Sequence, residues 1–425
     1  MANLLTSQRF LPLFITQFLG AFNDNLLKNA LVILITYHLA TSAQNAQMLV
    51  TLAAGLFILP FFLFSALAGQ LADKYDRAKI TRFVKLFEIL IMCCASVGFW
   101  LHDAWFLIGV LFASGVHSTF FGPVKYALLP QQLHANELLL GNAYIEAGTF
   151  LAILFGTIYG GILIITQHGA YAVSICLLIV AIAGYISSRY IPAAPPPVPR
   201  LKINYNLAQE TMSLIRYSRM NKKVMLTIVC ISWFWFIGAI FLAQLPGFVK
   251  INLHAEAKVV TLLLTLFSIG IGLGSLICTT ILRGAIRSTY VPAAALGMSL
   301  FIIDLYFCST NDLYYNVHGL YSIQQFLHFN ISWRIILDLT FVAICGGIYI
   351  VPLYTILQHI ANQTYMARII ASLNIFNALF MVFATLFTLG MLSMHRSIPE
   401  IFVSVAIANI LIAIYLRRKL NHSST

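Results

Sequence analysis

Long apolar stretches, separated by short polar or Gly- and Pro-containing breaks, run along the whole chain. A helix crosses the hydrocarbon core of a bilayer, roughly 30 Å thick, with about 20 residues. Division of the sequence at its breaks gives twelve such stretches, the third of which is the least apolar because Lys85 and Glu88 enter it. They cover residues 10–39, 48–70, 80–100, 104–127, 138–165, 168–190, 223–249, 257–282, 289–309, 333–358, 368–392 and 398–416. The pattern predicts an all-α membrane protein with twelve transmembrane helices.

Composition excludes a soluble protein. Of the 425 residues, 60% are hydrophobic and only 9% are charged, whereas soluble domains carry about 25% charged residues. So few charges do not cover a globular surface. The seven cysteines lie inside apolar stretches without metal-binding spacing, and buried cysteines of this kind usually act as small hydrophobic residues. We therefore expect neither a disulfide framework nor a metal or other cofactor.

The net charge of +12 is distributed over alternate loops. If the N-terminus is cytoplasmic, eighteen Lys and Arg residues fall on the cytoplasmic side and four on the other. Basic residues concentrate in cytoplasmic loops of membrane proteins, so both termini are predicted to be cytoplasmic. This placement also argues against nucleic acid as a partner. The first stretch lacks a small-residue cleavage site and is interpreted as a retained helix.

One long connection divides the chain. It begins with the stiff segment "IPAAPPPVPR" and continues with a sequence that predicts an amphipathic surface helix near Leu207 to Ser218. We expect a six-helix bundle over residues 1–191, a cytoplasmic linker over 192–222 and a second six-helix bundle over 223–425. "GPVKYALLPQQL" and "VPLYTILQHI" are weakly similar segments of the two halves. Two parallel repeats of six helices are the architecture of major facilitator transporters.

Several polar residues fall inside predicted membrane helices. An ionised side chain at the bilayer centre costs about 2.5–3.5 kcal/mol on insertion scales, so it usually faces a cavity or a partner. Residues four apart share a helix face, as Asp24 does with Lys28 and Asn142 with Glu146. The alternative to a binding role is structural pairing within the bundle. The candidates for substrate binding or gating are Asp24, Asn25, Lys28, Lys125, Asn142 and Glu146.

The loop after the second stretch reads "GQLADKYDRAK". It resembles the signature of the major facilitator superfamily, G-x-L-A-D-[RK]-x-G-[RK]-[RK], although Asp76 replaces the second glycine. Gly69 would allow close helix approach, and Asp73 would cap a helix or pair with a basic residue of a neighbouring helix. We expect a conformational latch at Gly69, Asp73, Lys74 and Arg77. The alternative is an ordinary charged loop.

Longer segments resemble a particular family, the bacterial lysophospholipid transporters. They are "TQFLGAFNDNLLKNAL", "FFGPVKYALLPQQLHANELLLGNAYIEAGTFLAILFGTIYGG", "SWFWFIGAIFLAQLPGFV" and "GGIYIVPLYTILQH", and the third is most like the transporter half of fused transporter–acyltransferase proteins. The resemblance implies movement of lysophosphatidylethanolamine-like lipids across the bacterial inner membrane by alternating access. The positions that match the polar pattern of the family are Asp24, Asn25, Lys125, Asn142 and Glu146. Some members carry an arginine in the seventh helix near the position of Leu242, so Lys28 becomes the expected basic partner of Asp24.

Two other functions remain open at this stage. One is proton-coupled transport of another amphiphile or a small solute, such as a drug or siderophore. The other is catalysis, because the fused relatives carry an acyltransferase. No histidine is followed by aspartate in the His-x4-Asp spacing of such acyltransferases, and the chain has no G-x4-G-K-[ST] phosphate-binding loop. We therefore expect a transporter and not an enzyme, with an acyltransferase as a separate partner.

Overall fold

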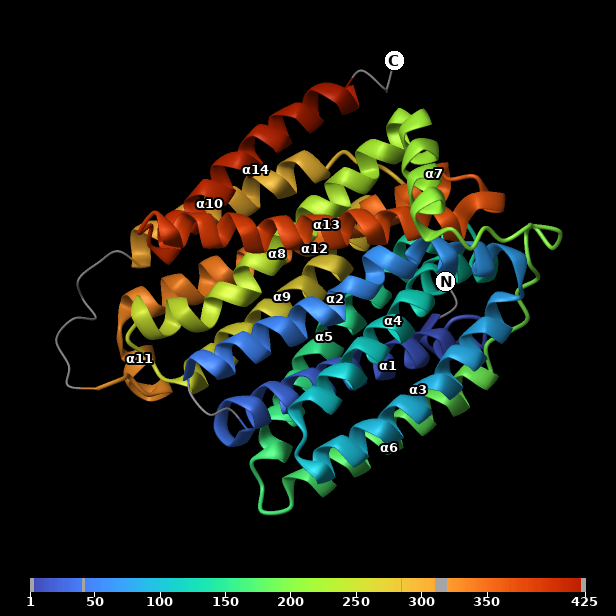
Figure 1. The fold of residues 1–425 in the computed structure, drawn as a ribbon. Helices are drawn as coiled ribbons and strands as arrows, with labels where there is room; N and C mark the ends of the chain where they lie inside the picture. Colours follow the sequence, from blue (N-terminus) through green and yellow to red (C-terminus); the bar gives the residue numbers. More distant parts are fainter. Residues whose placement is uncertain (1–3, 40–42, 284, 310–318, 422–425) are drawn as a thin grey trace. The chain divides into compact units, whose positions relative to one another are not determined.

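The structure is a computed structural model that describes residues 4–39, 43–283, 285–309 and 319–421. Within these ranges the regular structure consists of helices and one isolated bridge between Ala255 and Tyr321. The helices are α1 (Leu11–Leu34), α2 (Ala43–Lys74), α3 (Arg77–Leu101), α4 (Ala104–Gln132), α5 (Leu138–Ile164), α6 (Gly169–Arg189), α7 (Leu207–Met220), α8 (Lys222–Ile251), α9 (Ala257–Leu282), α10 (Val291–Ser309), α11 (Ile323–His328), α12 (Asn330–Ile360), α13 (Met366–Ser393) and α14 (Ile398–Asn421) (Figure 1). Every predicted stretch corresponds to one long helix, which confirms the all-α, twelve-helix architecture.

Eleven of these helices are long and apolar enough to cross a membrane. The remaining long helix, α1, has 24 residues and contains the polar sequence around Asp24. It ends at Leu34 and continues as one wider π-helical turn over Ile35–Leu39, so the predicted stretch 10–39 is a helix with an altered last turn. The short helices α7 and α11 are additional to the membrane-spanning set.

The turn between α3 and α4 has a clear local cause. His102 ends α3 in the left-handed conformation, with φ 54°, a common way to terminate a helix. The next residue, Asp103, accepts hydrogen bonds from the backbone N–H groups of Trp105 and Phe106 and so caps α4. Asp76 caps α3 in the same way through the N–H of Lys79. The short turn at His102 and Asp103 makes α3 and α4 antiparallel neighbours.

Packing divides the chain into two units. The first consists of Met1–Gly141, Leu151–Ile228 and Leu357–Ala378, and the second of Asn142–Phe150, Val229–Ile356 and Leu379–Thr425. Each unit thus includes a segment from the other half of the sequence, since part of α5 packs in the second unit and the α12–α13 junction packs in the first. The division into two six-helix bundles and a linker, with boundaries near residues 191 and 223, describes the order of helices along the sequence and stays a prediction.

The first unit is built on close helix contacts. Helix α1 packs against α4 and α6, α3 packs against α4 and α6, and α2 packs against α4 (Figure 1). A Cβ atom added to Gly115 of α4 would lie 2.4 Å from the carbonyl oxygen of Phe57, and one added to Gly156 would lie 2.3 Å from that of Phe22. Only glycine permits these backbone approaches.

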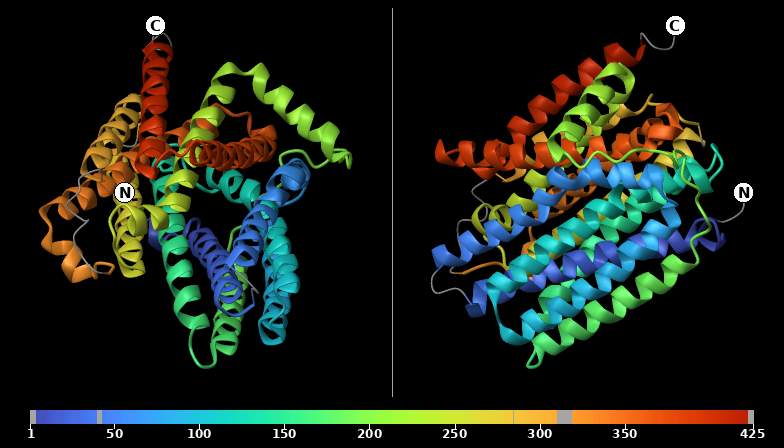
Figure 2. Two further views of the ribbon diagram at one scale, coloured as in Figure 1. Left: turned by 60° about the vertical axis from the view of Figure 1, so that its left-hand side comes forward. Right: turned by 45° about the vertical axis from the view of Figure 1, so that its right-hand side comes forward.

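The segment between α6 and α7 lies along the ends of α2, α3 and α4 (Figure 2). The N–H of Val198 donates to the carbonyl of Asp73 over 3.0 Å, and the N–H of Arg77 donates to the carbonyl of Ala194 over 3.1 Å. Gln70 and the backbone of Asn204 exchange two hydrogen bonds of 2.8 and 3.1 Å. The linker is therefore fastened to the first unit along its length.

Helix α7 confirms the predicted amphipathic helix. Two residues of the predicted apolar face, Leu214 and Ser218, are buried, and Leu214 packs with Ala66 and Ala371. The hydroxyl of Ser218 donates to that of Ser372 over 3.0 Å. The ring of Tyr217 stacks on that of Tyr365 at a centroid distance of 4.8 Å.

The second unit has its own close contacts. Helix α10 packs against α14. A Cβ atom added to Gly274 of α9 would lie 2.0 Å from the carbonyl oxygen of Ile344 of α12. The Nδ2 group of Asn409 donates to the carbonyl of Ala295 over 2.7 Å, which joins α14 to α10 by a buried hydrogen bond.

Candidate functional site

Asp24 lies in the middle of α1 and is almost buried, with 9% of its surface exposed. Its carboxylate accepts a hydrogen bond of 2.6 Å from Ser114 of α4 and a second one from Ser118. The two serines are four residues apart and therefore lie on one face of α4. Helices α1 and α4 thus hold this carboxylate through two hydroxyl groups, and it is not among the ion pairs of the described residues.

The structure corrects the expected ion pair between Asp24 and Lys28. Among the ion pairs of the described residues, Lys28 does not pair with Asp24, and its Nζ lies 5.9 Å from the ring centre of Phe57 on α2. The physical reason is that the hydroxyls of α4 already occupy the carboxylate. The neighbouring amides bond to the backbone: Asn25 donates to Ala21 over 2.8 Å and Asn29 to Thr157 over 2.7 Å.

A second group of charges includes residues next to Asp24 and Ser118 in the sequence and two charged residues of α3. The Nζ of Lys85 is 2.5 Å from Oε2 of Glu88, and both side chains are buried. The Nε2 of His117 lies 3.5 Å from the same oxygen. Asn23 donates to the other oxygen, Oε1, over 3.2 Å. This buried charge cluster, made of Asn23, Lys85, Glu88 and His117, joins α1, α3 and α4.

The cluster is not predicted as a site from the sequence, although Lys85 and Glu88 stand out as two charges in the third stretch. Lys85 and Glu88 are three residues apart, which is compatible with an ion pair on one helix face. Two opposite charges inside an apolar stretch were therefore an available signal. His117 gave no such signal, because its relation to Glu88 depends on the packing of α4 against α3.

A third polar centre contains the motif residue Asp73. One carboxylate oxygen accepts from Nη2 of Arg77 over 3.0 Å, and the other accepts from Nε of Arg368 over 2.9 Å. The backbone N–H of Ala367 donates to Asp73 over 3.3 Å. Arg77 also donates to the carbonyls of Ala72 and Ala127, each over 3.0 Å. We call Asp73, Arg77 and Arg368 the Asp73 latch.

The other two motif residues have different surroundings. A Cβ atom on Gly69 would lie 2.9 Å from Cα of Arg368, so this glycine permits the approach of α2 to α13. The Nζ of Lys74 lies 5.6 Å from the ring centre of Tyr75, and Lys74 is not among the ion pairs of the described residues. Arg368 was missed because it is 295 residues from Asp73 in the sequence.

Helix α7 also faces the Asp73 latch. Burial raises the pKa of Glu210, and the positive charge of Arg368 partly opposes this rise. The guanidinium carbon of Arg368 lies 3.9 Å from the ring centre of Tyr365, which is itself stacked on Tyr217 of α7. The linker helix and the latch are therefore in electrostatic and aromatic contact.

The remaining predicted site residues belong to α4 and α5. The Nζ of Lys125, on α4, lies 4.6 Å from the ring centre of Tyr126. In the second unit, Asn142 donates to the hydroxyl of Thr355 over 3.2 Å. Glu146 is completely buried one turn further along α5. Phe150 follows after another four residues, so these three side chains share one face of α5.

A small apolar cavity of about 60 Å³ lies beside Phe150 in the second unit. Its wall includes Phe234, Trp235 and Gly238 of α8. The ring of Phe150 is stacked on that of Trp235, at a centroid distance of 6.2 Å. A Cβ atom on Gly238 would meet no other atom within 4 Å. The polar face of α5 therefore leads into an aromatic cavity with room for apolar groups.

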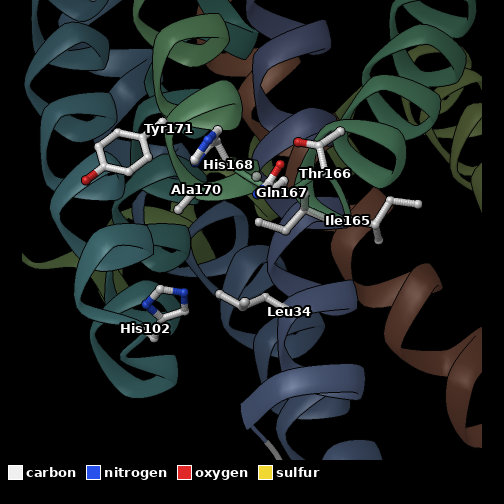
Figure 3. A pocket seen from close by; sticks show the side chains of 10 residues that line it. Leu34, His102, Ile165, Thr166, Gln167, His168, Ala170 and Tyr171 are labelled. Atoms are coloured by element: carbon white, nitrogen blue, oxygen red, sulfur yellow. The ribbon is translucent and has the colours of Figure 1, made fainter.

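Figure 3 shows another cavity, which lies in the first unit and is lined by Leu34, His102 and Tyr171 among others. It adjoins the C-terminal end of α3, whereas Arg77 of the latch is at the N-terminal end of that helix. In the second unit the potential ligand atoms of Asp304, Cys308 and Asp338 lie within 4.8 Å of one another. The guanidinium of Arg334 pairs with Asp304 and supplies positive charge there, so we assign no metal to this group.

Comparison with solved structures shows the same fold in transporters. A bacterial homologue of the iron transporter ferroportin, in an outward-facing state, aligns with a TM-score of 0.69 at 12% identity and covers 98% of this chain and 100% of that chain. The transporter FucP, in an outward conformation, aligns with a TM-score of 0.71 at 12% identity over 97% of this chain and 99% of that chain.

Comparison of sequences gives lysophospholipid transporters among the related proteins. The lysophospholipid transporter LplT of Escherichia fergusonii is 25% identical over 363 residues, which cover 83% of this chain and 81% of that protein. LplT of Serratia proteamaculans is 25% identical over 360 residues, with the same coverage. The sequence model described as Major Facilitator Superfamily matches residues 13–385. The chain is therefore a multi-pass membrane transporter that belongs to the major facilitator superfamily.

Proposed function

We propose that this transporter moves lysophospholipids across the inner membrane of a bacterium, with both of its termini in the cytoplasm. A lysophospholipid has one acyl chain and a small head group with a phosphate and, in the ethanolamine form, an ammonium. It requires polar groups for the head and an apolar surface for the chain. The lysophospholipid transporters that resemble this chain support that substrate class.

The observation that carries the proposal is the face of α5 in the second unit. Asn142, Glu146 and Phe150 follow each other at four-residue intervals, and Phe150 borders the apolar cavity. At 1.5 Å per residue, successive side chains are about 6 Å apart along the helix. An ammonium held by the Glu146 carboxylate would therefore place the acyl chain at the aromatic cavity.

Polar residues of the first unit are further candidates for contacts with the head group. Asp24 is suited to an ammonium group, and Lys28 or Lys125 to a phosphate. The Asp73 latch would stabilise one of the conformations between which an alternating-access transporter moves. An acyltransferase that restores the second acyl chain would be a separate protein.

The first experiment is transport by the purified protein in proteoliposomes. We expect uptake of labelled lysophosphatidylethanolamine above that of protein-free vesicles, and loss of uptake in the Asp24→Asn variant without loss of folded protein. Absence of uptake by the wild type would reject the lipid substrate. Wild-type rates in Asp24→Asn would assign Asp24 a structural role.

A second experiment tests where the acyl chain binds. Bromine atoms on the chain of a lysophospholipid quench the fluorescence of a tryptophan that they contact. We expect the quenching to decrease in Trp235→Phe but not in Trp233→Phe, because Trp233 is buried and does not line the cavity. Equal quenching in the wild type and in Trp235→Phe would exclude the cavity as the site of the chain.

The alternative is a proton-coupled transporter of another amphiphile or small solute. The same proteoliposomes distinguish the two functions. Under the alternative, a drug-like compound or a siderophore would be taken up and the lysophospholipid would not.

A further inference from the structure

Helix α7 presents one face to the protein and leaves another exposed. The packed face contains Leu214 and Ser218, which contact residues of α2 and α13. On the opposite side, exposed side chains lie three and four residues apart, a spacing that places them on one face of the helix. Two of them are apolar, Met212 at 58% exposure and Met220 at 78%. We call this side the exposed face of α7, and it consists of Met212, Arg216, Arg219 and Met220.

The segment that contains α7 is strongly basic. Residues 200–223 include six basic side chains and one acidic side chain, that of Glu210, which interacts with Arg368 of the latch. The six basic side chains are exposed and are not among the ion pairs of the described residues: Arg200, Lys202, Arg216, Arg219, Lys222 and Lys223. The exposed face of α7 and its two flanks therefore form a positively charged surface.

The contacts of the linker with α2 show how deep α7 lies. Before α7 begins, Asn204 bonds to Gln70. Within α7, Leu214 contacts Ala66, which is one turn further from the end of α2 at Lys74. Ala66 is eight residues before that end, which is about 12 Å at 1.5 Å per residue. Helix α7 therefore lies beside the last turns of α2 and not beyond them (Figure 1).

Helix α13 and two exposed tyrosines give the same depth. Leu214 also contacts Ala371, which is five residues inside α13 from its start at Met366, or about 8 Å. Tyr75 directly follows α2 and is 48% exposed, and Tyr190 directly follows α6 and is 71% exposed. Tyrosines are enriched where membrane helices reach the water interface. Helix α7 is therefore at the level of the lipid head groups.

Anionic phospholipids match the chemistry of the exposed face. The cytoplasmic leaflet is negatively charged, and each Lys or Arg close to such a surface strengthens binding about fivefold. The guanidinium groups of Arg216 and Arg219 can each form two hydrogen bonds to a phosphate. The flexible side chains of Met212 and Met220 adapt to irregular apolar surroundings, such as the upper part of the acyl chains. An acidic soluble protein would match the charge but not the depth of α7.

We propose that the exposed face of α7 binds the head groups of anionic phospholipids in the cytoplasmic leaflet, and that this contact stabilises the Asp73 latch. The connection to the latch is short. The ring of Tyr217 on α7 stacks on that of Tyr365, and the guanidinium carbon of Arg368 lies 3.9 Å from the centre of the second ring. The choice of leaflet rests on the orientation given with the proposed function, whereas the binding of anionic head groups does not.

The first test measures which lipid contacts the exposed face. Met212→Trp adds a tryptophan there, and the protein is placed in nanodiscs, which have the same lipids on both sides. Bromine atoms are carried on the acyl chains of either phosphatidylglycerol, which is anionic, or phosphatidylcholine, which is zwitterionic. The chain has five tryptophans of its own, so the quenching of the added one is the difference between Met212→Trp and the wild type.

We expect half-maximal quenching of the added tryptophan at a fraction of phosphatidylglycerol at least about fivefold lower than that of phosphatidylcholine, the contribution of one basic residue. Arg216→Gln together with Arg219→Gln should remove the difference. Arg417→Gln together with Arg418→Gln, an exposed basic pair on α14, should retain it. Equal quenching by the two lipids overturns the proposal. Absence of quenching by either lipid also overturns it, because α7 then faces water, as a surface for a soluble partner would.

The second test connects the lipid to the latch. We expect phosphatidylglycerol, but not phosphatidylcholine, to raise the midpoint of thermal unfolding of the detergent-solubilised wild type. The rise should be retained in the Arg417 and Arg418 double variant and lost in the Arg216 and Arg219 double variant. It should also be lost in Asp73→Asn, whose exposed face is intact and still prefers phosphatidylglycerol in the quenching test. An equal rise in Asp73→Asn overturns the effect on the latch.

Neither test measures transport. Their failure therefore overturns the binding of anionic head groups and leaves the lysophospholipid substrate intact. Absence of lysophospholipid uptake by the wild type rejects the proposed substrate and leaves the quenching and unfolding results as they stand.

Discussion

Asp73→Asn removes the negative charge at the centre of the Asp73 latch. The side chain of Arg77 is completely buried, and that of Arg368 is 10% exposed. The substitution leaves both guanidinium groups without their anion while it keeps the size of the side chain. Hydrogen bonds to charged groups contribute about 1.5–3 kcal/mol each, and loss of one partner of a buried ion pair costs about 3–5 kcal/mol.

The structure places the expected loss near the lower end of that range. Arg77 keeps its hydrogen bonds to the carbonyls of Ala72 and Ala127, and the oxygen of the new amide can still accept one hydrogen bond. We therefore expect a loss of about 3 kcal/mol. Arg368→Gln should cost less by itself, and the double variant should be little worse than Asp73→Asn, because residues of one network are not additive.

The assay is thermal unfolding of the detergent-solubilised protein, followed by the amount that remains monodisperse on size exclusion. The control is Asp103→Asn, the same substitution at the exposed N-cap of α4, where both hydrogen bonds go to the one oxygen Oδ1 and asparagine caps a helix as well as aspartate does. We expect the control to melt like the wild type and Asp73→Asn to melt well below it. An unchanged midpoint in Asp73→Asn, or fully additive losses with Arg368→Gln, would refute this account of the latch.

Two further predictions concern the cavity and the buried charge cluster. Gly238→Leu should fill the cavity and displace about two methylene groups of a bound acyl chain, which at about 0.8 kcal/mol each weakens lysophospholipid binding roughly tenfold. Gly390→Leu is the matched control, since a Cβ there also meets no atom within 4 Å, and equal effects in the two variants would contradict the cavity. Glu88→Gln leaves Lys85 buried without an anion and should cost about 3–5 kcal/mol. The double variant with Lys85→Gln should recover most of the loss in thermal unfolding, and a double variant that is less stable than Glu88→Gln would show that the pair is not the cause.

The arrangement of helices could be predicted from the sequence because each helix satisfies its own backbone hydrogen bonds and must match the thickness of the bilayer. Apolar length alone therefore locates an element such as α9, predicted and observed over residues 257–282. The amphipathic α7 could be predicted for a related reason, since its period of apolar residues marks a face that needs a surface to cover it.

The contacts of the site could be predicted only in part. The sequence identifies Asp24 as an unusual charge, but serines are too common in membrane helices for Ser114 and Ser118 to be recognised as its partners. Spacing within one helix suggested Lys28 as the partner of Asp24, whereas the contact depends on which helix packs opposite. The same limit applies to Arg368, whose relation to Asp73 has no counterpart in local spacing.

The Asp73 latch has a consequence for the synthesis of the protein. Asp73 and Arg77, the two latch residues that belong to the motif, are synthesised early. Arg368 is synthesised 295 residues after Asp73. At about 5–20 residues per second on the ribosome, this interval is about 15–60 s. During that time the nascent first unit exists without its α12–α13 segment, and Asp73 has only Arg77 as an ion-pair partner within the latch. Completion of the unit is thus a late step of biogenesis, and a ribosome that stops before residue 368 leaves a membrane-inserted chain whose latch is open.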